Sequence, residues 1–112
     1  MIRIEYPQRL GRGLNDRLHW AARARMAKEQ RTRAMRELQV RVSLRANVTL
    51  PVTVTLTRIA PSKGVDGDNL QGATKALRDG VADWLGIDDA DPRVTWVYAQ
   101  ERGPWGVRIE VQ

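Results

Sequence analysis

Residues 48–57 read VTLPVTVTLT, and this stretch decides the fold class. Valine or leucine occupies every second position, and threonine or proline lies between them, which is the period-two pattern of a strand with one face in a core. Pro51 has no amide proton to donate, so the first part of the stretch is expected at a sheet edge or as a lead-in to the strand. Residues 61–64, PSKG, break the pattern. The chain therefore contains a β-sheet with one buried face.

Two helices are expected, one before and one after this strand. Residues 18–38 are strong helix formers, and Asn15 or Asp16 can cap their helix. Residues 68–85 form the second helix, which Gly86 ends at a C-cap position. The first helix is expected to be basic and half-buried, through a narrow apolar stripe of Trp20, Ala24, Ala27, Ala34 and Leu38.

Short strands complete the pattern. Residues 1–6 alternate between apolar and polar side chains and stop at Pro7. Residues 94–100 and 107–111 lie on the two sides of a GPWG turn. The resulting order, β-α-β-α-β-β, predicts an α+β fold with a single small mixed sheet of about four strands and two main helices.

The composition excludes several classes of protein. With 112 residues the chain is expected to form one domain over residues 1–112. It has no cysteine, which excludes disulfide scaffolds, thiolate zinc sites, iron–sulfur clusters and cysteine nucleophiles. No apolar run approaches the roughly 20 residues of a membrane span, and the N-terminus has no signal-peptide core. We expect a cytoplasmic protein with no membrane partner and no small-molecule cofactor.

The charge is strongly positive and unevenly distributed. The chain has 19 Lys and Arg against 13 Asp and Glu, for a net charge of +6, and 16 of the 19 cations are arginine. Residues 1–45 hold 12 cations and 4 anions, whereas residues 46–112 hold 7 and 9. Seven of these nine anions are aspartates between residues 66 and 91. Because the arginine fork pairs well with phosphate, the basic part favours a nucleic-acid partner.

The aspartates are arranged around the second helix. At 100° per residue, Asp68, Lys75 and Asp79 fall within about 40° of one another, so they form one exposed row. Asp66 lies just before the helix. The opposite, apolar face consists of Leu70, Ala73, Leu77, Val81 and Trp84. The loop after the helix adds Asp88, Asp89 and Asp91.

This pattern admits two interpretations. Hard dications such as magnesium bind several carboxylate oxygens and activate water beside a phosphate, so the aspartates predict a metal site. Alternatively, Asp-Gly-Asp-Asn is turn and cap chemistry and residues 88–91 form a solvated loop. Lys75 and Asp79 are then a surface ion pair at i and i+4.

The arrangement resembles the RusA family of Holliday junction resolvases. The resemblance lies in Asp66-x-Asp68-Asn69-Leu70, in Lys75 followed four residues later by Asp79, and in the later Asp88-Asp89, and it covers about residues 52–100. Residues 15–20, NDRLHW, and the basic helix after them are similar to phage-borne members. The resemblance implies a RusA-like homodimeric endonuclease that uses magnesium, with manganese as a second option. Such enzymes nick paired strands symmetrically at four-way DNA junctions in a bacterial or phage-infected cell.

The family pattern assigns roles to individual residues. Asp66, Asp68 and Asp89 would be catalytic metal ligands, with Asp88 as an additional candidate, and Lys75 would stabilise charge on the phosphate. The family's lysine usually lies four residues after the second aspartate, where this chain has Gly72. Either Lys75 reaches the same phosphate from one turn further on, or cleavage is weakened.

The departure at Gly72 motivates an alternative function, a non-catalytic RusA-like protein that binds DNA. A third hypothesis is a small RNA- or protein-binding accessory domain. In the first two cases a set of cations is expected to contact DNA, namely Arg9, Arg12, Arg17, Arg23, Arg25, Lys28, Arg58, Lys63 and Arg78.

The single histidine and the aromatic residues admit structural roles. For His19 a structural role, capping a helix or packing beside Trp20, is favoured over a catalytic one. Because it is the single histidine of the chain, a multi-histidine metal site is excluded. Trp96 and Tyr98 share one strand face, in the core or at a dimer interface. Trp105 either stacks on an exposed base or covers a sheet edge.

Overall fold

A computed structural model describes residues 1–13, 19–42 and 48–112. Its helices and strands follow the predicted order, β-α-β-α-β-β, so the α+β prediction is confirmed. They are β1 (Ile2–Tyr6), α1 (Trp20–Arg41), β2 (Val52–Ala60), α2 (Gly67–Leu85), β3 (Val94–Arg102) and β4 (Gly106–Val111).

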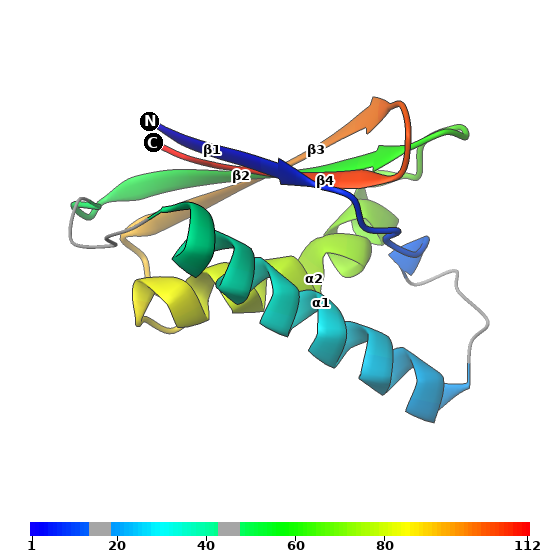
Figure 1. Ribbon diagram of the computed structural model, residues 1–112, viewed down its shortest axis with the longest axis horizontal. Coiled ribbons are helices and arrows are strands. Elements are labelled where there is room, and N and C mark those ends of the chain that lie inside the picture. Colours follow the sequence, from blue (N-terminus) through cyan, green and yellow to red (C-terminus); the bar gives the residue numbers. More distant parts are fainter. Residues whose placement is uncertain (14–18, 43–47) are drawn as a thin grey trace.

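The four strands form one mixed sheet in the order β1-β4-β2-β3. β4 is antiparallel to both β1 and β2, whereas β3 is parallel to β2. Two parallel neighbours need a crossover connection, and α2 supplies it. Both helices cover the same face of the sheet (Figure 1). The core therefore lies between that face and the helices.

Alternation along the strands builds the sheet side of this core. Val54 and Leu56 of β2 are fully buried, and they pair with Val111 and Ile109 of β4. From the helix side, α2 contributes its whole predicted apolar face, and all five residues are buried: Leu70, Ala73, Leu77, Val81 and Trp84. Gly86 ends α2 with a left-handed φ of 73°, as the sequence predicts.

The bounds of β2 differ from those predicted by the alternation. The strand begins at Val52, directly after Pro51, which confirms the lead-in role of the proline. It then continues to Ala60, because its pairing with β3 extends to that residue. Val48 and Leu50 lie outside the strand but pack against the core. The hydrogen-bonded pairing of β2 with β3 therefore determines where the strand begins and ends, and the apolar pattern of the sequence does not.

The apolar stripe expected on α1 is only half correct. Ala34 and Leu38 are buried, but Trp20 is 75% exposed and Ala24 and Ala27 are also exposed. The reason is visible in Figure 1, where the N-terminal half of α1 runs away from the sheet. The periodicity of a helix cannot show where the surface beneath it ends.

The cap of α1 is His19, which corrects the prediction that Asn15 or Asp16 caps it. The Nδ1 atom of His19 accepts a hydrogen bond from the amide of Ala21 at 3.2 Å, so the structural role of the histidine is confirmed. Asn15 and Asp16 lie outside the described residues.

Within the parts of the chain that the structure describes, no helix is long and apolar enough to cross a membrane.

A glycine allows α1 and α2 to cross closely. A Cβ atom at Gly80 would collide with the carbonyl oxygen of Arg31 and would lie 2.9 Å from the Cβ of Ala34. At Gly67, also in α2, a Cβ atom would meet nothing within 4 Å. The two glycines therefore form a matched pair for a stability test.

Gly80→Ala is expected to lower the free energy of unfolding by about 1–3 kcal/mol, because α1 must shift to accept the new methyl group. Gly67→Ala is expected to be neutral or to stabilise by up to ~1 kcal/mol, since alanine favours the helix. Urea unfolding of both variants beside the wild type measures the difference. Equal midpoints for the two variants would contradict the close crossing.

Candidate functional site

The N-terminus of α2 is built around Asp66, which is its N-cap. The Oδ1 atom of Asp66 accepts hydrogen bonds from the Asn69 amide at 3.0 Å and from Asn69 Nδ2 at 2.8 Å. These bonds hold the pKa of Asp66 below its ordinary value, so the carboxylate is ionised at neutral pH. The capping role is therefore confirmed, and it leaves an anionic oxygen pair at the start of the helix.

Gln100 of β3 holds the segment before this cap, and sequence reasoning missed it. Its Nε2 donates to the Val65 carbonyl at 2.8 Å, and its Oε1 accepts from the Val65 amide at 2.9 Å. Gly64 lies so close that a Cβ atom there would be 2.5 Å from Oε1 of the glutamine. Because Gln100 continues the alternation of Trp96 and Tyr98, the sequence carried a signal for its place on the helix-facing side of β3, although the side chain itself is exposed.

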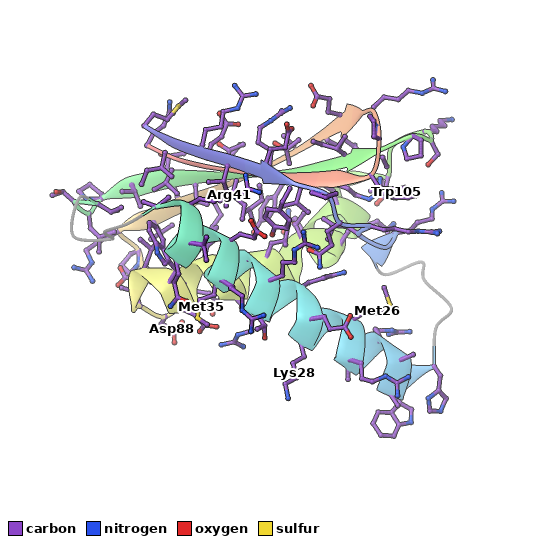
Figure 2. All side chains as sticks on the ribbon, viewed as in Figure 1. Met26, Lys28, Met35, Arg41, Asp88 and Trp105 are labelled. Carbon is purple, nitrogen blue, oxygen red and sulfur yellow. The ribbon has the colours of Figure 1, made fainter. Side chains whose placement is uncertain are left out.

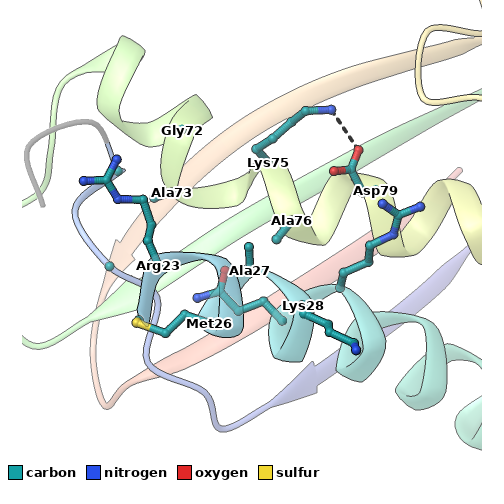
Figure 3. Close-up of a pocket in the computed structure, with 13 residues that line it drawn as sticks. Arg23, Met26, Ala27, Lys28, Gly72, Ala73, Lys75, Ala76 and Asp79 are labelled. Atoms are coloured by element: carbon teal, nitrogen blue, oxygen red, sulfur yellow. Dashed lines mark hydrogen bonds and ion pairs between the residues drawn. The ribbon is translucent and has the colours of Figure 1, made fainter. Parts of the chain in front are cut away.

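Lys75 lies between two carboxylates on the exposed side of α2. Its Nζ atom is 2.8 Å from Oδ1 of Asp79 and 2.8 Å from Oδ2 of Asp89, and the first contact is drawn in Figure 3. The hydrogen bonds raise the pKa of Lys75 and lower that of Asp89. The predicted pair of Lys75 and Asp79 is confirmed, and Asp89 extends it to a triad.

Asp89 is fixed further by Arg78 and two aromatic residues. Arg78 Nη2 donates to the Asp89 carbonyl at 2.7 Å, and its Nη1 donates to the Tyr98 hydroxyl at 2.7 Å. Trp96 Nε1 donates to the same carbonyl at 3.0 Å, and the Arg78 guanidinium lies 4.9 Å from the Trp96 ring centroid. Trp96 and Tyr98 thus pack against α2, on the core side of the sheet.

The three aspartates predicted as metal ligands lie at two levels of α2. Asp66 and Asp68 stand at its start, whereas Asp89 is held beside Lys75, about 10 Å further along the axis at 1.5 Å per residue. Accordingly, over residues 1–13, 19–42 and 48–112 no three His, Cys, Asp or Glu side chains are grouped so that they could hold a metal ion. The donors are nevertheless carboxylates, the oxygen ligands that magnesium prefers. The metal site stays a prediction.

The remaining loop aspartates have local partners. Asp88 Oδ1 accepts from the amide of Ala90 at 2.8 Å. Asp91 forms an ion pair with Arg93 at 2.8 Å, and the Arg93 hydrogen bonds lower the pKa of Asp91 to about 2. In Figure 2, Asp88 lies near the C-terminal end of α2. Both aspartates therefore serve the loop conformation that presents Asp89.

The predicted DNA-contacting cations are mostly on the surface. Arg78 is half-buried and engaged by Asp89, and Arg17 lies outside the described residues. The exposed ones are Arg9, Arg12, Arg23, Arg25, Lys28 and Lys63. The structure thus shows these six side chains on the surface, and their contact with DNA stays a prediction.

Arg58 differs from the expectation of an exposed cation beside the site. It is 2% exposed, and its Nε donates to the Gly11 carbonyl at 3.1 Å. Its guanidinium lies 5.6 Å from the ring centroid of Trp105, and that of Arg9 lies 4.7 Å from the same ring. The burial follows from the inward alternation of β2 and from these distant partners. Trp105 packs with two arginines at the end of the sheet away from Asp88 (Figure 2).

A two-point ion pair ties α1 to α2. Arg31 Nε lies 2.6 Å from Asp83 Oδ2, and Arg31 Nη2 lies 2.8 Å from Oδ1. The hydrogen bonds from Arg31 are the main cause of the lowered pKa of Asp83. Sequence reasoning missed this pair because its members are 52 positions apart.

Asp83→Asn is expected to lower the free energy of unfolding at pH 7 by ~1 kcal/mol or less, since both partners are substantially exposed. A carboxylate with a lowered folded-state pKa contributes stability above its unfolded pKa of about 3.9 and loses it as the pH falls through the folded value. The difference between variant and wild type should therefore shrink as the pH falls below about 4. Urea unfolding from pH 7 down to pH 3 measures it, with Arg31→Met as the second arm. A difference that stays constant with pH would contradict the ion pair.

Comparisons with known proteins add one relative. No family model matches the chain. An uncharacterized protein of Xylella fastidiosa (strain Temecula1) is 37% identical over 84 residues, which are 67% of this chain and 51% of that protein. The chain therefore spans about half the length of the relative that it matches.

Proposed function

We propose that the protein is a magnesium-dependent endonuclease that acts in the cytoplasm, as a homodimer, on four-way DNA junctions. The observation that carries the proposal is the exposed face of α2. There an ammonium group lies between two carboxylates, two turns of α2 beyond its Asp-x-Asp start, in a chain of net charge +6. The resemblance of residues 52–100 to RusA resolvases supports the choice of reaction and substrate.

Each residue of this face has a role in the proposed reaction. Asp66 and Asp68 would hold magnesium at the start of α2, and Asp89, with Asp88 as the additional candidate, would join them once its loop leaves Lys75 and moves toward that start. Magnesium bound there would supply charge stabilisation at the phosphate and an activated water. Lys75 donates a hydrogen bond to a non-bridging oxygen of the phosphate, through its third N–H or through the N–H freed when Asp89 leaves it. The incoming phosphate offers Lys75 a replacement anion.

Neighbouring residues position this machinery. Gln100 holds the segment that presents Asp66, and Arg78 holds the loop that presents Asp89. The exposed cations of α1 attract the phosphate backbone, since an acidic site approaches DNA only where arginine and lysine outweigh it. The strength of binding should therefore fall steeply with salt.

A second candidate is a DNA-binding protein without nuclease activity. Two observations favour it: Gly72 stands where the family's lysine is expected, and Asp89 is held away from Asp66 and Asp68. The same basic surface would then bind branched DNA and protect it or recruit other factors.

A nicking assay separates the two candidates. Purified protein is incubated with an end-labelled synthetic four-way junction, in magnesium or in EDTA, and with a duplex of the same arm sequence. Paired, symmetric nicks in the junction that require magnesium are the expected result. Binding without nicks at any protein concentration would replace the enzyme with the second candidate. Failure to prefer the junction over the duplex would contradict both.

A further inference from the structure

A groove of about 480 Å³ opens between α1 and α2, beside the proposed site. Its apolar part is lined by Met26, Ala27, Ala73 and Ala76. Its cations come from both helices, and only Asp79 among the lining residues opposes them. They are Arg23, Lys28, Arg31 and Lys75. Figure 3 shows Ala27 of α1 facing Ala76 of α2 across this groove.

The groove follows from how the two helices diverge. They touch where Gly80 meets the backbone of Arg31, and they separate toward the N-terminus of α1. At the far end the loop containing Gly13 closes the groove, since a Cβ atom there would overlap the carbonyl of Asn69. Gly13 has a φ of 73°, which favours glycine. Small side chains between these two contacts leave the volume empty of protein atoms.

We propose that this groove binds a single unstacked nucleotide of a branched DNA substrate. The base lies on the apolar part, and the phosphate faces the cations. The volume falls within the roughly 300–1,000 Å³ of small-ligand sites, and an apolar lining with few charged groups is typical of them. With the ion-pair partners of Arg31 and Lys75 included, the four cations stand against the three carboxylates of Asp79, Asp83 and Asp89, and the remaining excess of positive charge favours an anionic ligand.

The groove and the proposed catalytic residues share one side chain. Lys75 belongs both to the groove and to the triad with Asp79 and Asp89. A nucleotide held in the groove therefore brings its phosphate to Lys75, next to the carboxylates. Fully paired duplex offers no such nucleotide because its bases are stacked, whereas stacking is interrupted at the crossing of an open four-way junction. The inference rests on the proposed function and adds a structural basis for its preference for branched DNA.

A pair of alanines on α1 provides the test. Ala24 and Ala27 are both exposed and lie about one helical turn apart, but only Ala27 lines the groove. Ala27→Glu and Ala24→Glu change the net charge equally, so they differ only in whether the carboxylate enters the groove. Affinity for a fluorescent 12-residue oligothymidine and for a 12-base-pair duplex is measured in EDTA at one fixed salt concentration.

Ala27→Glu is expected to weaken binding of the single strand by about tenfold or more relative to Ala24→Glu, with equal duplex affinities for both variants. Ala27→Leu against Ala24→Leu repeats the comparison without a charge, and far-ultraviolet circular dichroism checks folding. Equal single-strand affinities within both pairs overturn the groove.

The outcome is independent of the nuclease proposal because no metal is present. A wild type that nicks junctions while Ala27→Glu keeps full single-strand affinity overturns the groove alone. Selective loss of single-strand binding in a protein that never nicks supports the groove and overturns the nuclease.

Discussion

Asp68→Asn is expected to abolish magnesium-dependent nicking of a four-way junction, with a loss of at least ~100-fold, while junction affinity changes by less than about threefold. Asparagine has nearly the shape of aspartate but no charge to hold a dication. In the described part of the chain no hydrogen bond or ion pair of the Asp68 side chain is found, so the substitution breaks no observed contact. The negative charge of Asp68 in the first turn of α2 stabilises the helix by ~1 kcal/mol at most.

The measurement compares initial nicking rates in magnesium with affinities in EDTA. Glu110→Gln is the matched control, because it removes one carboxylate from β4. Glu110 lies between the core residues Ile109 and Val111, so its own side chain is on the opposite face of the sheet. Asp66→Asn should follow Asp68→Asn and keep its helix, because asparagine is also a good N-cap. An Asp68→Asn protein that nicks at the wild-type rate would show that the metal assignment is wrong.

The α2 helix illustrates what the sequence could predict. Its two faces, its C-cap and the pair of Lys75 with Asp79 are local features, determined by spacing along one helix. The place of Asp89 is different. It depends on Arg78, Tyr98 and Trp96 meeting the loop after the helix, and no spacing within residues 66–91 contains that information.

Arg58 and α1 show the same limit elsewhere in the fold. The alternation of β2 places Arg58 on the inward face, but a cation there contradicts the apolar pattern. Its burial depends on the Gly11 carbonyl and on Trp105, which lie 47 positions away in each direction along the chain. Likewise, the exposure of Trp20 depends on how far the sheet extends beneath α1. Local patterns therefore predicted the elements and the buried face of α2, whereas distant contacts determined the burial of Arg58 and the exposure of Trp20.

Lys75→Met is expected to lower the nicking rate at saturating magnesium by about 100-fold, the usual cost of removing one charged donor from a phosphate in its transition state. The side chain is 56% exposed, so its two ion pairs contribute ~1 kcal/mol or less to folding and the variant should remain folded. Arg41→Met, at the last residue of α1, is the control for loss of one exposed cation. Lys75→Arg keeps the positive charge but replaces the compact ammonium group with a guanidinium, so it should restore only part of the rate.

The magnesium dependence distinguishes catalysis from mere neutralisation of carboxylates. If Lys75 acts on the phosphate, kcat falls while KM for the junction stays nearly constant, because the interaction is made chiefly in the transition state. If Lys75 only neutralises Asp79 and Asp89, its removal leaves kcat intact and lowers the magnesium concentration at half-saturation, since the dication no longer competes with an ammonium. A wild-type kcat in Lys75→Met would assign the lysine to structure, and the phosphate contact would then have to come from another cation near the groove.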